Sequence, residues 1–141
     1  MTKQGLRLIA PACLAILLVL SGCAAPTPTP LPPMATRMED LVGIWTARFG
    51  GEPAYMQYKV DGTFILAKSI ADLANNPITS GKVWFEGSTF YARDPLCDGD
   101  GAYHVLLDKE NGAPVLKFQW VKDLCRERTR DLKWAMRKVE P

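Results

Sequence analysis

Histidine is nearly absent from this sequence, which has one, His104, among 141 residues. With no serine or cysteine motif beside it, a nucleophile, a base and an orienting group cannot be assembled. A zinc site is not expected, because the cysteines lack further nitrogen ligands. Asp94, Asp98 and Asp100 offer oxygen ligands, but their spacing does not fit the calcium-loop pattern and indicates solvated acids in a turn. We therefore predict that the protein is not an enzyme and has no catalytic residues, no metal site and no cofactor.

A strong charge of either sign is also missing. The formal net charge is +2, from 17 basic and 15 acidic residues. Lys3 and Arg7 supply that excess, so the chain beyond residue 22 is neutral and gives no reason to expect a nucleic-acid partner. The segment 126–138 is basic with acids interleaved, which is typical of a solvated mixed-charge face. Contact with anionic lipid headgroups or an acidic partner is the alternative.

Long hydrophobic runs are confined to the N-terminus. Residues 8–20 are apolar, interrupted only by Pro11, and follow Lys3 and Arg7 with no acid between them. The run is about a third shorter than the roughly 20 residues that a bilayer core requires. A charged start, a short apolar core and small residues at the end therefore favour a secretory signal peptide over residues 1–22 rather than a transmembrane anchor.

Small residues close this run in the tetrapeptide Leu20-Ser21-Gly22-Cys23. The tetrapeptide resembles the lipobox of bacterial lipoprotein signal peptides. The resemblance implies cleavage before Cys23, diacylglycerol on its thiol and an acyl chain such as palmitate on the new amine. We expect a cell-envelope protein whose membrane contact is the lipid on Cys23, on the outer face of a membrane. Ala24, a non-aspartate, implies the outer membrane where the organism has one.

Prolines follow the cysteine at positions 26, 28, 30, 32 and 33. They favour an extended polyproline conformation of roughly 3.1 Å per residue and cannot pack into a core. We predict a Pro/Thr-rich tether over residues 23–37. The remaining residues, 38–141, suit one small domain.

Cysteine is scarce, and two of the four cysteines are not expected to be available for pairing in the domain. Cys13 leaves with the signal peptide and Cys23 takes lipid, which leaves Cys97 and Cys125. In an exported protein such a pair is expected to form a disulfide, with free thiols or a metal pair as alternatives. The disulfide would close a loop of about 28 residues and stabilise the fold by on the order of 3 kcal/mol.

Apolar and polar residues alternate through the domain between turn signals such as Asp61-Gly62 and Asn111-Gly112. Strands are predicted over residues 43–49, 55–60, 63–67, 82–85, 89–93, 103–107, 115–120 and 132–136, with a helical turn near residues 70–75. Leu132, Met136 and Val139 also fit one helical face, so a terminal helix is the alternative for the last segment. Eight short strands at even spacing predict an all-β antiparallel barrel or meander.

Gly43-Ile44-Trp45 at the start of the first predicted strand resembles the Gly-x-Trp signature of lipocalins and their calycin relatives. Gly101-Ala102-Tyr103 and Cys125-Arg126-Glu127-Arg128 are similar to motifs of small lipocalin-like bacterial lipoproteins. The resemblance implies an eight-stranded up-and-down barrel in which Trp45 plugs the closed end and an arginine packs over its ring. We assign that arginine to Arg128, with Arg130 and Arg126 as alternatives.

Aromatic residues on the predicted strands are candidates for lining an apolar pocket, although core packing explains them equally well. The candidates are Tyr55, Tyr58, Trp84, Tyr91 and Trp120. Eight strands enclose an interior barely wide enough for side chains or one small ligand. We therefore carry two hypotheses for a monomeric barrel: it binds a small hydrophobic ligand, or it is a filled structural or interaction module. A cavity well below a few hundred cubic ångströms argues against the first.

Overall fold

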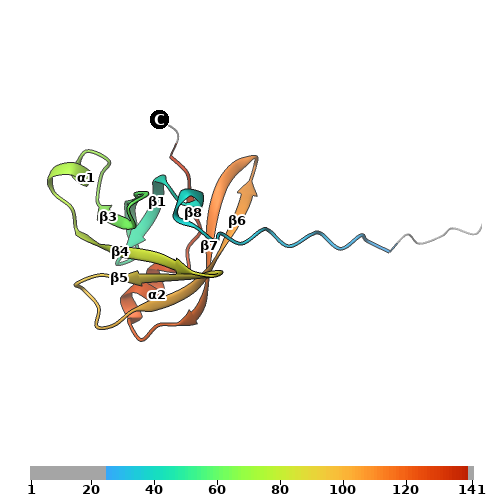
Figure 1. The fold of residues 1–141 in the computed structure, drawn as a ribbon. Helices are drawn as coiled ribbons and strands as arrows, with labels where there is room; N and C mark the ends of the chain where they lie inside the picture. The colour runs from blue at the N-terminus through green and yellow to red at the C-terminus, as the bar shows by residue number, and fades with distance from the viewer. Residues whose placement is uncertain (1–24, 140–141) are drawn as a thin grey trace, which may run out of the picture.

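An antiparallel sheet of eight strands makes up most of the structure, a computed structural model that describes residues 25–139 (Figure 1). The strands neighbour one another in sequence order, and the sheet curls into a nearly closed barrel, which confirms the predicted fold class. The strands are β1 (Gly43–Phe49), β2 (Glu52–Tyr58), β3 (Thr63–Ala67), β4 (Thr79–Glu86), β5 (Thr89–Arg93), β6 (Gly101–Glu110), β7 (Ala113–Lys122) and β8 (Met136–Arg137). The helices are the 3-10 helix η1 (Met38–Asp40), α1 (Asp72–Asn75) and α2 (Arg126–Leu132).

The signal peptide and Cys23, as predicted above, lie outside the described residues. Within the described part of the chain, no helix is long and apolar enough to cross a membrane. The expected helical turn near residues 70–75 is confirmed by α1.

The turns alternate between the two ends of the barrel because the strands run up and down. One end, which we call the base, has η1 and the β2–β3, β4–β5 and β6–β7 turns. The other, which we call the α2 end, has the β1–β2 turn, the 94–100 connection and α2. A hydrogen bond of 3.0 Å from the Gly50 N–H to Asp131 Oδ2 fastens α2 to the β1–β2 turn.

Strand β8 closes the barrel, although it has only two residues. Met136 pairs with Leu116 of β7, and the Val139 N–H donates to the Ile44 carbonyl of β1 at 2.9 Å. One isolated bridge, between Trp45 and Lys138, therefore links the two edges of the nearly closed barrel.

The predicted strand over 132–136 is wrong, because residues 126–132 form α2 and only Met136 lies in β8. The Cys125 sulfur accepts a hydrogen bond from the Arg128 N–H and caps the helix, a role that the alternation of apolar residues does not reveal. Leu132 and Met136 are both buried, but they belong to different elements. A helix does form near the C-terminus, as the alternative expects, but it ends at Leu132 and does not include Met136 or Val139.

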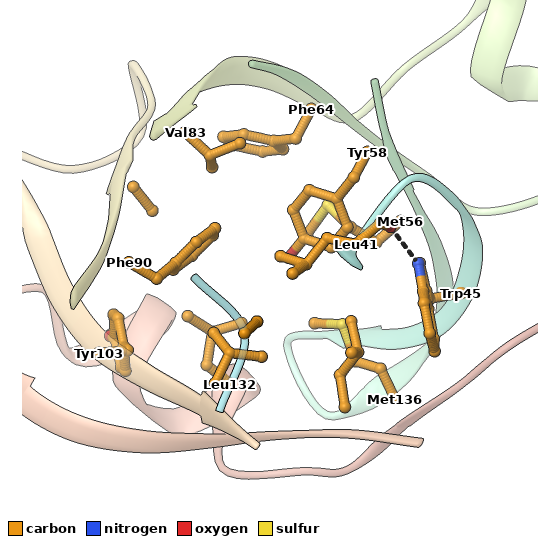
Figure 2. Packing of buried hydrophobic residues seen from close by; sticks show 14 of the residues in the cluster. Leu41, Trp45, Met56, Tyr58, Phe64, Val83, Phe90, Tyr103, Leu132 and Met136 are labelled. Atoms are coloured by element: carbon orange, nitrogen blue, oxygen red, sulfur yellow. Dashed lines mark hydrogen bonds between the residues drawn. The ribbon is translucent and has the colours of Figure 1, made fainter. Parts of the chain in front are cut away.

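Trp45 plugs the base, as the resemblance implies. Its ring is buried, and its Nε1–H donates to the buried Leu41 carbonyl at 2.7 Å, directly after η1 (Figure 2). Gly43 has φ +133°, a backbone conformation that residues with side chains rarely adopt. The chain therefore needs glycine two residues before the plug.

The cation over the Trp45 ring is not an arginine. Lys138 Nζ lies 5.3 Å from the ring centroid, so the assignment of Arg128 to this place is wrong. The reason is topological: Arg128 belongs to α2 at the opposite end, whereas Lys138 follows β8, which closes against β1.

The tether joins the sheet earlier than the predicted domain boundary at residue 38. The Ala35 N–H donates to the Val105 carbonyl, and the Leu107 N–H donates to the Pro33 carbonyl, both at 2.8 Å. Strand β5 pairs only with residues 101–103 of β6, which leaves this part of the β6 edge open for the incoming chain. The extended residues before Pro33 run away from the barrel (Figure 1).

Candidate functional site

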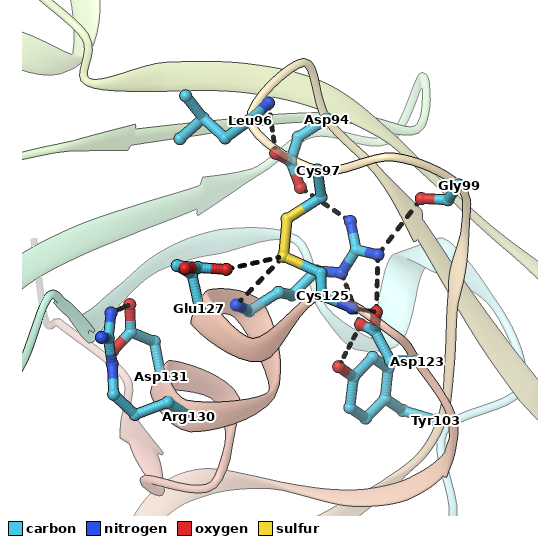
Figure 3. Close-up of a disulfide and its surroundings, with 11 residues drawn as sticks. Asp94, Leu96, Cys97, Gly99, Tyr103, Asp123, Cys125, Glu127, Arg130 and Asp131 are labelled. Carbon is cyan, nitrogen blue, oxygen red and sulfur yellow. Dashed lines mark hydrogen bonds and ion pairs between the residues drawn. A yellow bond between two sulfur atoms is a disulfide. The ribbon is translucent and has the colours of Figure 1, made fainter.

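Two connections at the α2 end lie side by side and are covalently joined. Residues 94–100 link β5 to β6, and residues 123–125 precede α2. Cys97 and Cys125 form a disulfide between them, with their Cα atoms 5.6 Å apart (Figure 3). The pairing that the cysteine count predicts is therefore present in the structure.

Arg128 is the centre of a buried ionic network beside the disulfide. Its Nη1 lies 2.8 Å from Asp94 Oδ2 and its Nε lies 2.6 Å from Asp123 Oδ2, and the side chain is 7% exposed. Its Nη2 donates to the Gly99 carbonyl at 3.2 Å. The guanidinium thus holds both connections together. The prediction that Asp94 is a solvated acid is wrong, because this ion pair buries it.

Two residues of β6 are adapted to the network. The Tyr103 hydroxyl donates to Asp123 Oδ2 at 2.5 Å. A Cβ on Gly101 would lie 2.2 Å from that same oxygen and 2.8 Å from Arg128 Nε, so any side chain there would displace Asp123 and Arg128. Asp123 Oδ1 also accepts the Cys125 N–H at 2.8 Å. The two motifs of the lipoprotein resemblance, around Gly101 and Cys125, therefore meet in one structural unit.

Arg128 and Asp123 are both charged at neutral pH. Burial by itself would raise the pKa of Asp123, but hydrogen bonds from Arg128, Tyr103 and the Cys125 N–H outweigh it and lower that pKa below its usual value. Burial opposes the charge on Arg128 as well, yet Asp123 and Asp94 raise its pKa. Every charged group is matched by a partner, so the arrangement stabilises structure and offers no free acid or base for chemistry.

The lowered pKa of Asp123 predicts acid sensitivity. A carboxylate whose pKa is lower in the folded than in the unfolded state stabilises fully above the unfolded value of about 3.9, and this contribution disappears as the pH falls through the folded value. We expect the urea midpoint of the wild type to fall more steeply below about pH 4 than that of Asp123→Asn. Asp98→Asn, at an exposed position of the 94–100 connection, serves as control and should follow the wild type. Equal pH profiles for wild type and Asp123→Asn would contradict the assignment.

Reducing the disulfide is expected to destabilise the domain by about 3 kcal/mol, because the closed loop restricts the unfolded chain. The bond spans 28 residues of sequence. Urea denaturation of the double variant Cys97→Ser/Cys125→Ser, followed by circular dichroism, measures the loss. A midpoint unchanged from that of the oxidised wild type would show that the network alone holds the connections.

The barrel interior contains a small cavity that opens at the α2 end. Its volume is about 70 Å³, and most of its lining is apolar, including Phe49, Met56, Tyr58 and Phe90. Thr79 also lines it, and its Oγ1 has no hydrogen-bond partner among residues 25–139. Pockets for small-molecule ligands usually measure roughly 300–1,000 Å³, so this one is several times too small.

A second hollow of about 450 Å³ lies outside the barrel, between β4 and the 94–100 connection. It is broadly open to solvent, and Lys82, Arg93 and Asp98 are among its lining residues. Arg93 is already engaged by both carboxylate oxygens of Asp100, at 2.5 and 2.7 Å. The hollow is therefore a surface depression with its main cation neutralised.

Of the five aromatic residues predicted to line a pocket, only Tyr58 does so. Side chains alternate along a strand, and on β2 Ala54, Met56 and Tyr58 point inward, which places Tyr55 on the outer face. On the outside of β4 and β5, Trp84 stacks on Tyr91 with ring centroids 5.4 Å apart. Trp120 is 61% exposed. The prediction is wrong for Tyr55, Trp84, Tyr91 and Trp120.

Other side chains fill the interior, and the alternation of inward and outward positions along each strand predicts them. Met56, Phe64, Val83 and Phe90 sit at the inward positions of their strands. By contrast, the partners of Arg128 come from connections, whose pairing no periodicity reveals. His104 lies in β6 with its Nδ1 3.0 Å from the Ser88 carbonyl, an ordinary strand position.

Among residues 25–139, no cluster of three or more His, Cys, Asp or Glu side chains could hold a metal ion. The chain matches no protein-family model, no curated protein sequence and no solved structure.

Proposed function

We propose that this protein is a lipid-anchored interaction module of the bacterial cell envelope, a filled barrel that works through its outer surface. The observation that carries the proposal is the interior, where side chains leave a cavity of only about 70 Å³. Such a barrel offers a rigid outer surface for contacts with other molecules and leaves no room for a ligand inside.

Aromatic rings occupy the space that a ligand would need. Phe90 packs edge-to-face against Tyr58, Phe85 and Phe118, with ring centroids 6.1, 5.5 and 5.6 Å apart. Tyr103 continues the series against Phe118 at 6.2 Å. Contacts of this kind contribute about 0.5–1.5 kcal/mol each beyond the burial of apolar area, so opening the interior would cost stability.

The anchor is supported by the N-terminal sequence and by the way the tether meets the barrel. Between Cys23 and the first residue paired to β6, Pro33, the chain has a proline-rich stretch that spans roughly 30 Å at 3.1 Å per residue. The hydrogen bonds of Pro33 and Ala35 to β6 fix the point at which the tether enters the fold. Lipid on Cys23 would thus hold the barrel at a set distance from the membrane.

Mass spectrometry of the mature N-terminal peptide tests the anchor. We expect a chain that begins at Cys23 and carries a diacylglyceryl thioether and an acylated amine. A mature chain that begins at any other residue, or an unmodified Cys23, would contradict the proposal.

Ligand binding is the second candidate, favoured by one observation. The unpartnered Thr79 Oγ1 in an apolar cavity could hydrogen-bond to a small amphipathic molecule. Equilibrium dialysis with hexadecanoic acid separates the candidates. The filled barrel predicts no saturable uptake, and one-to-one uptake that disappears in Ala92→Phe, a substitution on the cavity wall, would favour the ligand-binding candidate.

A further inference from the structure

The two sulfurs of the disulfide differ in their access to solvent. Cys97 is partly exposed and lines the hollow between β4 and the 94–100 connection, which we call the outer hollow. Cys125 does not line the outer hollow and is only 8% exposed. An incoming thiolate reacts with a disulfide only at a sulfur that it can reach. The outer hollow therefore gives a thiol a route to Cys97 and leaves Cys125 covered.

Two groups next to Cys125 also favour attack at Cys97. Glu127 Oε2 lies 3.7 Å from Cys125 Sγ, and this carboxylate repels a thiolate that approaches the sulfur (Figure 3). The Arg128 N–H donates to the same sulfur at 3.5 Å, and this hydrogen bond supports negative charge on Cys125 when the disulfide breaks. Cys125 is therefore the leaving sulfur of an exchange reaction.

The outer hollow has the size and charge to admit a small thiol. Its volume of about 450 Å³ lies within the range of roughly 300–1,000 Å³ that is usual for small-molecule pockets. Arg93 and Asp94 on its wall are ion-paired. Lys82 and Asp98 also line it, and neither forms an ion pair with another of residues 25–139. These two opposite charges balance, so the hollow excludes neither a neutral nor a singly charged thiol.

The two connections stay together when the disulfide opens, because a second link crosses the same gap. Arg128 joins Asp94 of the 94–100 connection to Asp123 of the 123–125 connection, at 2.8 and 2.6 Å. The Cys97 and Cys125 Cα atoms are 5.6 Å apart, and the ionic network keeps them opposed after the sulfur–sulfur bond breaks. The disulfide can therefore open and form again within a folded domain.

We propose that the Cys97–Cys125 disulfide is a reversible modification site, at which a small thiol enters the outer hollow and forms a mixed disulfide with Cys97. The incoming thiolate bonds to Cys97 Sγ, the Cys97–Cys125 bond breaks, and Cys125 leaves as a thiolate that takes up a proton from water. One sulfur–sulfur bond replaces another, so the step needs no further oxidant or reductant. Return attack of the Cys125 thiolate on Cys97 Sγ releases the thiol and restores the disulfide. This inference concerns the chemistry of the disulfide alone and does not depend on the interaction-module function.

The site of attack is tested on the mature protein purified from envelopes, with 2-mercaptoethanol as a small neutral thiol. A brief reaction is stopped with acid, free thiols are alkylated with N-ethylmaleimide, and the cysteine peptides are identified by mass spectrometry. We expect the mixed disulfide on Cys97, with Cys125 alkylated, about tenfold or more often than the reverse. In urea-unfolded protein, where both sulfurs are accessible, the preference should disappear. Removal of the free thiol should return the native disulfide without an added oxidant.

A substitution in the outer hollow tests the route. Pro95 is exposed and lines the hollow, so Pro95→Trp narrows it without changing the charge and should slow the formation of the mixed disulfide about tenfold. Pro53→Trp, at an exposed proline of β2 outside the hollow, is the matched control and should react at the wild-type rate. Circular dichroism checks that both variants are folded.

Four results would overturn the inference, and each leaves the interaction-module proposal intact. Equal adducts on both cysteines of the folded wild type, or a preference for Cys125, would contradict the assigned site of attack. A disulfide that reacts only in urea would be a purely structural bond. A mixed disulfide that persists after the free thiol is removed would contradict reversibility. A folded Pro95→Trp that reacts as fast as the wild type would show that the thiol does not enter through the outer hollow.

Discussion

Replacing Trp45 with alanine is expected to lower the free energy of unfolding by about 3–5 kcal/mol, a large part of a small domain's stability. The indole is buried at the base of the barrel, in the same cluster as Leu41 and Met136 (Figure 2). Its removal leaves a cavity and leaves the buried Leu41 carbonyl without its 2.7 Å donor. Lys138 also loses the ring beneath its ammonium group.

Urea denaturation followed by circular dichroism measures this loss. Trp45→Phe keeps an aromatic ring but not the donor, and it should fall between the wild type and Trp45→Ala. Trp134→Ala is the matched control, because that indole is 48% exposed and lies near the α2 end. If Trp45→Ala cost no more than Trp134→Ala, the base of the barrel would not be organised around this plug.

Replacing Arg128 with methionine should cost about 3–5 kcal/mol, because the change leaves two buried carboxylates without their counter-charge. The side chains of Asp94 and Asp123 are only 7% and 1% exposed. Arg126→Met on the same helix removes an exposed arginine and should change stability little.

The charge explanation has a direct check in a triple variant. Arg128→Met combined with Asp94→Asn and Asp123→Asn removes the unpaired charges together with their partner, so most of the lost stability should return. A triple variant as unstable as Arg128→Met would show that Arg128 acts by packing and not by charge.

Local signals predicted most of the sheet, because each hairpin is determined by its turn and by the alternation beside it. The strands β1, β3 and β5 begin and end at the predicted residues, 43–49, 63–67 and 89–93. Strands β6 and β7 extend past the predicted residues at both ends, and at the β6–β7 turn the added residues are polar and held by ion pairs such as Glu110 with Lys117. Alternation cannot reveal the extension at the turn, because the residues there have no buried face.

Features that depend on contacts between distant segments could not be predicted. Helix α2 has only seven residues, and its N-cap is the sulfur of the disulfide-bonded Cys125. The sequence therefore lacks the serine, threonine, aspartate or asparagine that usually marks the start of a helix. The role of Arg128 depends on Asp94 and Asp123, two residues in different connections. Whether the barrel is hollow depends on how aromatic rings from five strands fit together, which composition does not determine.

The filled interior is the central claim, and a native mass spectrum of the protein purified from envelopes tests it most directly. The spectrum should show the lipidated polypeptide with an intact disulfide and no additional small molecule. A stoichiometric non-covalent adduct that survives purification and leaves on unfolding would mean that the barrel opens to hold a ligand, and would contradict the interaction-module account.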